Sequence, residues 1–292
     1  MTLPSVTLSL GGGARRRKLA IAMPIEGTPE NAMVHLAPQL TLNKLANAVF
    51  MDGRGDTMPI QVGSYDVTRA RDRYTREFLH GDRFRDCTDL LHWDSDVNPR
   101  DLEVINRLMA TDHDVVGCPY RRKKDGEDYP YSLGGRVGSK RIDVVRGCVE
   151  VEWLAFGFML TSRAALQKMW DAYHASRWWF DQDKAPDGTV TLKETVGMFD
   201  QIYTDVRPGP DGQPWRTKTS EDYGFCESYR KIGGRVMMFV GEGSPVDHIG
   251  EYVFKGTREG LAGEAANVLA SRLSESFALD EPEDPRAMPV EP

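Results

Sequence analysis

Hydrophobic positions in the first 118 residues follow two different spacings. Short apolar runs, typical of buried strands, occur at 19–23, 60–63, 89–93 and 114–118. Between these runs, apolar residues recur three or four positions apart, as on one face of a helix, at Val67, Ala70, Tyr74 and Phe78 and again at Leu102, Ile105 and Leu108. The alternation of strand and helix patterns predicts a mostly parallel sheet covered by helices.

Helix start signals place three helices between these strands. One follows the polar loop at 24–31 and reaches about Ala48, although Pro38, a residue that disrupts helix interiors, lies within it. A second begins after Ser64, a residue type that is favoured at helix N-caps. A third is expected at Asn98-Pro99, because asparagine can cap a helix and proline suits its first position.

The second half of the chain is less regular. Its expected elements, in chain order, are a basic loop at 121–146, one or two strands within 149–161, a helix at 162–173, a polar region rich in Pro and Gly at 181–219, a helix from Ser220 to Gly233-Gly234 and a strand at 235–240. The predicted fold class is α/β, a single domain with a Rossmann-like, mostly parallel central sheet flanked by helices.

The predicted domain covers residues 18–256. A loose leader at 1–17 precedes it, and a C-terminal helix at 257–279 and an acidic, Pro-rich tail at 280–292 follow it. Ligands of such sheets bind at the carboxyl ends of the strands. Polar residues that directly follow a predicted strand are therefore the first candidates for chemistry.

Charge and cysteine usage exclude several classes of protein. The formal net charge is −7, and the tail at 280–292 holds five acids against one Arg, which leaves about −3 for the rest. The body is therefore not a strongly basic nucleic-acid binder. No apolar run approaches the roughly 20 residues of a membrane span. The four cysteines form no CxxC pair, which indicates reduced, buried thiols in a cytoplasmic protein and excludes a disulfide scaffold or a zinc ribbon.

The most informative motif is Asp94-Ser95-Asp96, directly after the strand at 89–93. Two carboxylates one residue apart can lie on one side of a turn and offer hard oxygen ligands to a divalent cation, which keeps other positions for waters and phosphates. The alternative is a solvated turn that caps the helix expected at Pro99. Both interpretations stay open, and the position after a buried strand favours the metal.

Two further motifs contain candidate functional residues. Ser220-Glu221-Asp222 begins a helix, where acids favourably oppose the macrodipole, but a carboxylate there can also be a general base. His248 follows the strand at 235–240 and is a candidate third metal ligand, although a lone histidine is usually structural. Arg69 and Arg71 lie on the helix after Ser64 and can either be solvated or bind a phosphate.

The ordered segments LAIAMPIEG, RARDRYTREFL, LLHWDSDVNP, FGFMLTSRAAL, SEDYGFCESYRKIGG and DHIG together resemble the GT-A fold glycosyltransferases, which use nucleotide sugars and carry a DxD motif. The resemblance spans residues 18–256 and is strongest to the inverting branch, including compact soluble members from phage and bacterial genomes. The QxxRW motif and membrane helices of processive members are missing, which implies a single-transfer enzyme. The stretch from Met23 to Glu26 also lacks the usual Thr or Asp.

The resemblance implies a role for each matching position. Asp94 and Asp96, directly or through water, and His248 would bind Mn²⁺ or Mg²⁺, and Asp222 would be the base, with Glu221 beside it. Contacts to the nucleoside-diphosphate sugar, most often a UDP-sugar, would come from Pro24, Glu26, Gly27, Arg69, Arg71, Trp93, Ser95 and Gly157.

The acceptor is expected at the basic segment, which no family motif matches. Candidate acceptor-binding residues are Arg121, Arg122, Lys123, Lys124, Trp178 and Trp179. Basic and aromatic side chains together can hold phosphates and stack on bases or sugars. A hydroxylated base in phage-type DNA and a glycan or glycoconjugate both remain possible acceptors. A metal-dependent nucleotidyltransferase, which releases pyrophosphate, and a non-catalytic nucleic-acid-binding module are the alternatives to a glycosyltransferase.

Overall fold

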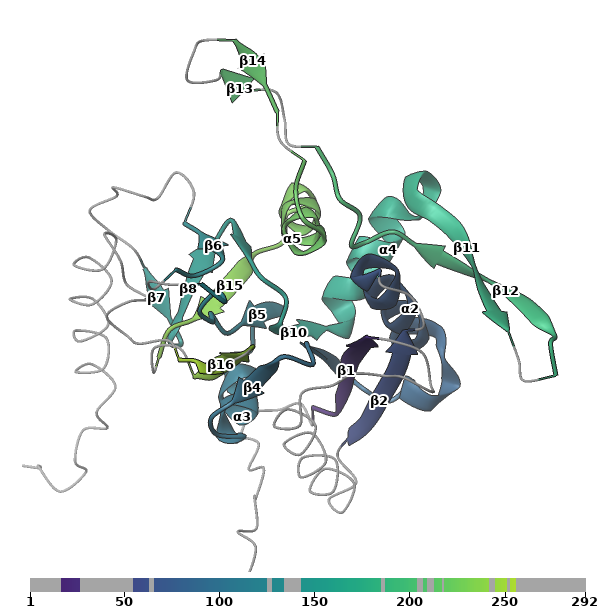
Figure 1. Cartoon of the computed structure of the whole chain (residues 1–292), viewed down its shortest axis with the longest axis horizontal. Coiled ribbons are helices and arrows are strands. Elements are labelled where there is room, and N and C mark those ends of the chain that lie inside the picture. The colour runs from purple at the N-terminus through teal and green to yellow at the C-terminus, as the bar shows by residue number, and fades with distance from the viewer. Residues whose placement is uncertain are drawn as a thin grey trace, which may run out of the picture.

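An eight-stranded sheet forms the centre of the molecule (Figure 1). From edge to edge its strands are β2 (Gly55–Val62), β1 (Leu19–Glu26), β3 (Asp89–Trp93), β10 (Phe158–Ser162), β5 (Val115–Gly117), β15 (Val236–Phe239), β8 (Cys148–Val151) and β7 (Val144–Val145). The computed structural model describes residues 17–26, 55–62, 66–124, 128–133, 143–184, 187–203, 207–208, 213–216, 218–241, 245–250 and 253–255.

Most of the strands in this sheet run in the same direction. β2, β1 and β3 are parallel neighbours, and so are β5 and β15. Only β10 and β8 run against the other six, since β10 pairs antiparallel with β3 and β5, and β8 pairs antiparallel with β15 and β7. The predicted α/β class with a mostly parallel central sheet is confirmed. The reversed strand β10 was not anticipated.

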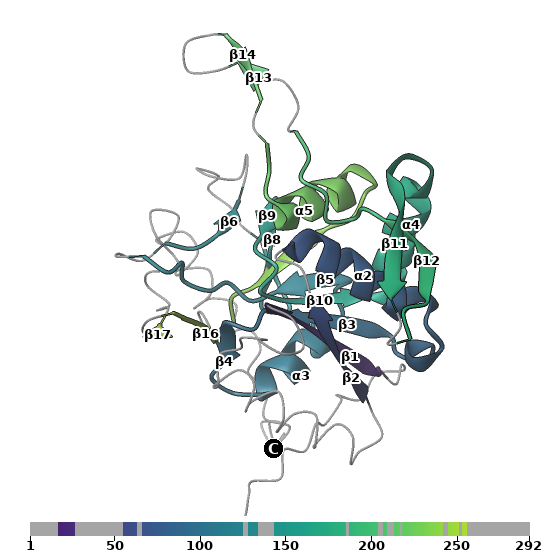
Figure 2. The same cartoon turned by 45° about the vertical axis from the view of Figure 1, so that its right-hand side comes forward.

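Helices cover both faces of the sheet (Figure 2). α2 (Val67–His80), α4 (Arg163–Arg177) and α5 (Glu221–Lys231) lie on one face, and α3 (Glu103–Ala110) lies on the other. Alternate residues of β1 enter the two cores: Ala20 and Ala22 pack beneath α2 and α4, while Ile21 and Met23 pack with α3. Because side chains alternate along a strand, an apolar run such as 19–23 serves both cores.

Two helices do not begin at the residues that the sequence predicts. The side chain of Asp66, not Ser64, caps α2 by accepting from the backbone N–H groups of Thr68 and Arg69. α3 begins at Glu103 rather than at Pro99, because Pro99 ends a short strand, β4 (Val97–Pro99), that pairs with β16 (Val246–Ile249). A long-range strand pairing thus overrides the local helix signal.

The other two helix starts were predicted correctly. Ser162 is the N-cap of α4, where its hydroxyl oxygen accepts from Ala165 N–H at 3.0 Å, and Ser220 is the N-cap of α5. The glycines at 233–234 follow the end of α5, and Gly233 has a left-handed φ of 81°. The four cysteines are buried and free, as predicted.

The polar region predicted at 181–219 contains strands among its described residues. β11 (Trp178–Lys184) and β12 (Val190–Val196) form a hairpin, and its turn contains Gly188 at φ 88°. The remaining short elements are η1 (Asp82–Phe84), β6 (Tyr131–Ser132), β9 (Trp153–Leu154), β13 (Arg207–Pro208), β14 (Pro214–Trp215) and β17 (Val253–Phe254).

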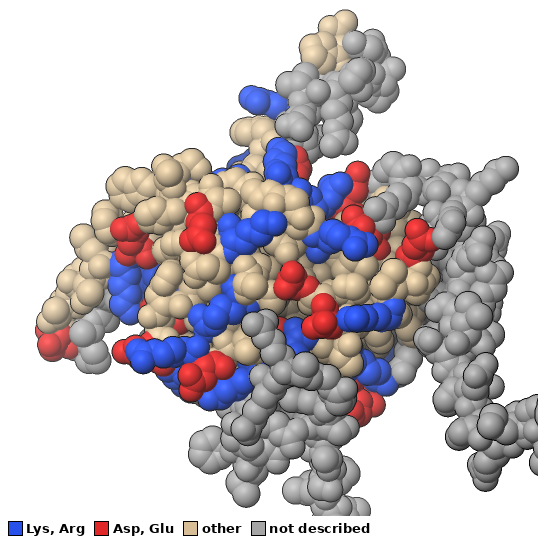
Figure 3. All heavy atoms as spheres, turned by 180° about the vertical axis from the view of Figure 1, so that it is seen from behind, with Lys and Arg blue, Asp and Glu red and all other residues tan. Residues whose placement is uncertain are grey.

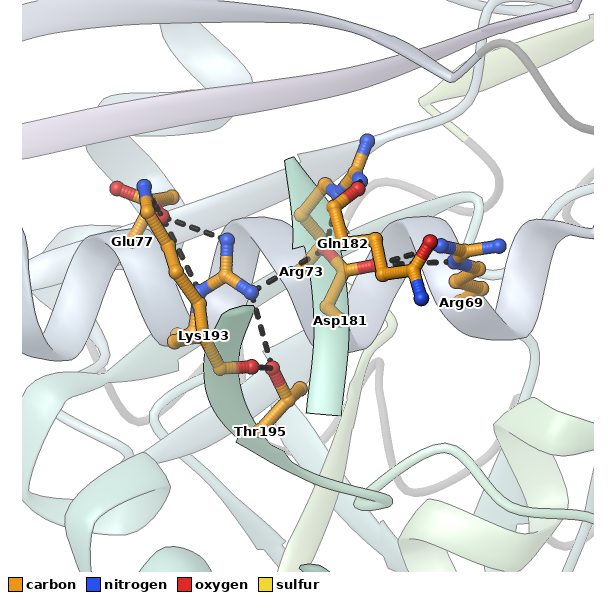
Figure 4. Close-up of polar contacts among 8 residues, drawn as sticks. Arg69, Arg73, Glu77, Asp181, Gln182, Lys193 and Thr195 are labelled. Atoms are coloured by element: carbon orange, nitrogen blue, oxygen red, sulfur yellow. Dashed lines mark hydrogen bonds and ion pairs between the residues drawn. The ribbon is translucent and has the colours of Figure 1, made fainter. Parts of the chain in front are cut away.

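A charged cluster joins the β11–β12 hairpin to α2 (Figure 4). The carboxylate of Asp181 is wholly buried and accepts hydrogen bonds from Arg69, Arg73 and Arg76. Burial raises the pKa of Asp181, but the hydrogen bonds from Arg73 and Arg69 outweigh it and lower the pKa to about 2. The hairpin is therefore attached to α2 through this ionised carboxylate and through contacts of Lys193 with Glu77 and of Thr195 with Arg76.

Several predicted segments lie outside the described residues: the leader except Arg17, the helix expected up to Ala48, the helix at 257–279 and the tail at 280–292. Among the described residues, no helix is both long enough and apolar enough to cross a membrane.

Candidate functional site

The two aspartates of the DSD motif lie in a turn at one edge of the central sheet. Asp94 directly follows β3, and its backbone N–H donates to the carbonyl of Gly157 at 2.9 Å. The N–H of Val97 in turn donates to the carbonyl of Asp94 at 3.1 Å, which closes the turn before β4. Gly157 and Asp94 meet here because β10 runs antiparallel to β3 and Phe158 pairs with Trp93.

Asp96 is the meeting point of three segments. Its Oδ2 atom lies 3.3 Å from Nε2 of His248 and 2.6 Å from Nζ of Lys123. Burial raises the pKa of Asp96, but the hydrogen bonds from His248 and Lys123 outweigh it and lower the pKa to about 2. The carboxylate is therefore ionised at neutral pH, with its charge directed at these two side chains.

The histidine has a defined orientation. Its Nδ1 lies 3.0 Å from the carbonyl oxygen of Arg121, which can only accept, so Nδ1 carries a proton. Nε2 faces the carboxylate of Asp96, which also accepts, so the two atoms share a proton in this arrangement. The backbone fixes this geometry, because the N–H of Ile249 donates to the carbonyl of Asp96 and the edge of the Tyr120 ring packs on the imidazole.

Arg71 occupies the centre of the site and links two carboxylates. Its side chain is 3% exposed; Nη2 lies 3.0 Å from both oxygens of Asp94, and Nη1 lies 3.0 Å from Oε1 of Glu221. The guanidinium also lies over the rings of Phe156 and Phe199. Burial lowers the pKa of Arg71, but the nearby carboxylates, Asp94 foremost, outweigh it and raise the pKa. Arg71 thus holds Asp94 and Glu221 in place.

Asp222 lies in the first turn of α5, beside Glu221. Its Oδ1 atom accepts from the Ser220 hydroxyl and from the N–H of Tyr223 at 2.9 Å. Among the described residues, none donates to Oδ2. Burial raises the pKa of Glu221, although Arg71 opposes this effect. The two neighbouring acids therefore differ in their partners, because Oε1 of Glu221 binds an arginine whereas Oδ1 of Asp222 accepts only from neutral groups of its own segment.

An aromatic pair that the sequence interpretation missed lies next to Asp222. The rings of Trp153, in β9, and Tyr223, in α5, are 4.0 Å apart between centroids, and both residues are half-buried. Nη2 of Arg122 lies 3.3 Å from the Tyr223 hydroxyl. A signal existed in the sequence, since Tyr223 directly follows the candidate base, but only the fold brings Trp153 to it.

The basic segment at 121–124 is largely paired with acids. Lys123 binds Asp96, while Lys124 and Arg122 both contact Asp128, at 2.5 and 3.5 Å. The surface opposite the view of Figure 1 likewise shows acidic and basic side chains interspersed (Figure 3). Arg122, Lys123 and Lys124 thus each have an acidic partner, which weakens the expected attraction of these residues for a polyanion, while residues 134–142 of the basic loop lie outside the described residues.

Some residues that were expected to bind donor or acceptor have other surroundings. Arg69 binds Asp181, and Trp179 lies beneath its guanidinium at 5.7 Å. Trp178 is 53% exposed and belongs to β11. This strand lies on the side of the molecule away from β4 and β16 (Figures 1 and 2). Trp93 is fully buried, and its indole N–H donates to the carbonyl of Val97. These contacts give Arg69 and Trp93 structural roles.

The other residues that were predicted to contact the nucleotide sugar lie near strand ends. Ser95 is half-buried in the turn between the two aspartates, and Pro24 and Glu26 belong to the last residues of β1. Gly27 lies outside the described residues. Gly157 donates its N–H to the Tyr120 hydroxyl at 3.2 Å, and a Cβ at this position would lie only 2.6 Å from that oxygen. Gly157 thus allows Tyr120 to pack close behind the site.

Comparison with known proteins finds matches among solved structures. No protein-family model and no curated protein matches the chain. Among solved structures, A197 from STIV is similar with a TM-score of 0.44 and 16% identity, over 80% of this chain and 85% of that one. A glycosyltransferase involved in the glycosylation of the major capsid of PBCV-1 is similar with a TM-score of 0.31 and 9% identity, over 55% of this chain and 68% of that one.

Proposed function

We propose that this protein is a metal-dependent glycosyltransferase that moves a sugar from a nucleoside diphosphate, most readily UDP, to an acceptor hydroxyl with inversion. The observation that carries the proposal is the approach of His248 Nε2 to Asp96 Oδ2, at 3.3 Å, beside the strand end at Asp94. A divalent cation that replaced the proton between these two atoms would be bound by one imidazole nitrogen and one carboxylate oxygen.

Two donor groups support a site for Mn²⁺ or Mg²⁺, since no three carboxylate, imidazole or thiol groups come together as a metal site among the described residues. Mg²⁺ is commonly held by one or two carboxylates with waters and phosphates at its other positions, and imidazole is a good ligand for transition metals. Asp96 and His248 would bind the cation directly. Asp94, whose oxygens both accept from Arg71, would act through a water. A bound cation would neutralise the charge that develops on the departing nucleoside diphosphate.

Asp222 is the proposed base. Ser220 and the Tyr223 N–H hold its Oδ1 atom, which orients Oδ2 toward a ligand. Oδ2 would accept the proton of the acceptor hydroxyl as that oxygen attacks the sugar from the face opposite the leaving group, and this attack gives inversion. Arg71 fixes Glu221 next to it and so limits Glu221 to a supporting role.

The proposed acceptor is a sugar rather than a base in DNA. The half-buried pair Trp153 and Tyr223 lies beside the proposed base and offers an aromatic face, which suits the apolar face of a sugar ring. The cations at 122–124 are paired with Asp96 and Asp128, so they offer little free charge to a long polyanion.

A thermal-shift panel of nucleotides and nucleotide sugars, with Mn²⁺ or with chelator, tests the donor and the metal together. Ligand at about 100 times its Kd adds about 2.7 kcal/mol, which is several degrees of Tm for a domain of this size. Asp96→Ala should abolish the Mn²⁺-dependent shift, whereas Asp94→Ala should weaken it. A shift that is unchanged in Asp96→Ala would refute the metal site.

Turnover separates the proposed base from the donor site. Asp222→Ala should bind donor and Mn²⁺ like the unmodified protein and lose at least about 100-fold in kcat, the usual contribution of a general base. Ser220→Ala, which removes only one partner of Asp222, is the matched control and should lose less. Release of free nucleoside diphosphate supports the proposal, and release of pyrophosphate would indicate a nucleotidyltransferase.

A further inference from the structure

The cation position of the proposed site already has a positive charge next to it. Nζ of Lys123 lies 2.6 Å from Asp96 Oδ2, the same oxygen that faces His248. The lysine side chain is 33% exposed and that of Asp96 is 31% exposed. An ammonium group and a divalent cation bound to this carboxylate oxygen would compete for the same lone pairs and the same charge.

The backbone around Lys123 is anchored while its side chain reaches into the site. The carbonyl of Arg121 accepts from His248, and the N–H of Arg122 donates to the carbonyl of Asp128 at 2.8 Å. The carbonyl of Arg122 also accepts from the N–H of Lys124 at 2.9 Å. Because these contacts do not involve the lysine side chain, Nζ can leave Asp96 by rotation of the side chain alone, without loss of the support of His248.

We propose that Lys123 is an internal counter-ion of Asp96 that a divalent cation displaces, and that the released ammonium then binds the diphosphate of the donor. This inference rests on the proposed function, because it concerns the same cation site. A strongly hydrated, mobile ammonium on a flexible stem is suited to such an exchange between a carboxylate and a phosphate.

Two consequences follow for binding. Lys123 opposes the metal, since each cation that enters must displace the ammonium. Lys123 also couples the metal to the nucleotide, since the displaced ammonium gains a phosphate partner. Coupling of this kind is reciprocal, so the nucleotide raises the affinity for the metal by the same factor as the metal raises the affinity for the nucleotide.

The experiment measures Mn²⁺ binding to the full chain by calorimetry, alone and with saturating UDP, in the unmodified protein and in Lys123→Met. Methionine keeps most of the stem and removes the charge. Lys123→Met should bind Mn²⁺ alone about threefold more tightly, the size expected for loss of a partly exposed ion pair. It should bind UDP in the presence of Mn²⁺ about tenfold more weakly, as expected for loss of a charge-assisted contact.

Two control variants distinguish this role from a general charge effect. Lys124→Met removes the neighbouring charge, which pairs with Asp128 instead, and should leave the affinity for Mn²⁺ unchanged. Lys123→Arg keeps the charge and should keep the weaker binding of Mn²⁺. Equal tightening in Lys123→Met and Lys124→Met would overturn the inference, because only long-range charge would then be acting.

The outcomes also separate the inference from the proposed function. If Mn²⁺ binding depends on Asp96 but is the same in Lys123→Met and the unmodified protein, the proposed function stands and the counter-ion role is wrong. If only Lys123→Met binds Mn²⁺, displacement is supported. If neither protein binds Mn²⁺, both the metal site and the inference are refuted. Unchanged UDP binding in Lys123→Met would refute transfer of the ammonium to the diphosphate.

Discussion

His248 Nε2 and Asp96 Oδ2 lie 3.3 Å apart although 152 positions separate the two residues in the chain. The pairing of β4 with β16 produces this approach, because Val97, next to Asp96, is the strand partner of His248. The carbonyl of Arg121 then sets which ring nitrogen carries the proton. Three segments of the chain therefore converge on Asp96, and the proposed cation site depends on this convergence.

Replacement of Arg71 should destabilise the protein strongly. Arg71→Met leaves Asp94 and Glu221 in a largely buried site without their shared cation, and breaking such a pair costs about 3–5 kcal/mol. Arg69→Met is the control, because its partner Asp181 keeps Arg73 and Arg76, and should cost about 1 kcal/mol. Urea unfolding gives both values, and similar losses in the two variants would contradict this account.

The free energy of unfolding should decrease at low pH, in part because Asp181 becomes protonated. Its pKa in the folded protein, about 2, lies below the usual value of 3.8, so the folded state favours the ionised form. That contribution, about 2 kcal/mol, is fully present above about pH 4 and is lost as the pH falls from 4 toward 2. Asp181→Asn should lower the free energy of unfolding at pH 7 and reduce its decline between pH 4 and pH 2.

The exposed Asp82, which pairs with the exposed Arg85, offers a matched control for this pH effect. Asp82→Asn should change the free energy of unfolding at pH 7 by less than about 0.5 kcal/mol. Urea midpoints at several pH values would distinguish the two aspartates. An acid dependence that is as steep in Asp181→Asn as in the unmodified protein would show that Asp181 is not responsible.

A side chain at Gly157 should disturb the residues that form the proposed cation site. The Cβ of Gly157→Ala would lie 2.6 Å from the Tyr120 hydroxyl oxygen, and Tyr120 is 7% exposed and packs on His248. We expect a loss of about 1–3 kcal/mol in stability and weaker Mn²⁺ binding. In a double-mutant cycle with Tyr120→Val, the two changes should be non-additive. Strict additivity would mean that Gly157 acts elsewhere.

Trp153 should contribute to acceptor binding. With a panel of mono- and disaccharides as acceptors, Trp153→Ala should raise the KM for the acceptor about tenfold and leave the KM for the donor unchanged, because the ring offers a stacking surface beside Asp222. Trp178→Ala is the control, since Trp178 is exposed on the distant β11–β12 hairpin. A larger increase of the acceptor KM in Trp178→Ala than in Trp153→Ala would indicate that the acceptor binds at that hairpin instead.

Local patterns in the sequence were sufficient for the fold class and for most elements. The runs at 19–23, 89–93 and 235–240 are strands, and the helix stripes beginning near Val67 and at Ser220 are helices. These signals are local, since the spacing of apolar side chains along a segment reflects the backbone conformation of that same segment. The DSD motif was found for the same reason, because its position after a buried strand is visible in the sequence.

The arrangement of the site required the tertiary structure. Nothing near Arg71 in the chain indicates that it binds Asp94 and Glu221, and nothing near Lys123 indicates Asp96. The reversed strand β10 brings Gly157 to Asp94, and the hairpin at 178–196 brings Asp181 to three arginines. Each of these contacts joins segments distant in sequence, so strand pairing and burial, rather than local preference, select them.

The sequence by itself therefore determined the strand and helix succession, the absence of disulfide pairing among four separated cysteines and the identity of the acidic turn at 94–96. The tertiary structure alone decided which cations and rings surround those acids: Arg71 on Asp94, Lys123 and His248 on Asp96, and Trp153 against Tyr223. The physical reason is that side-chain charges and ring faces act over only a few ångströms, and long-range strand pairing sets which of them come within that distance.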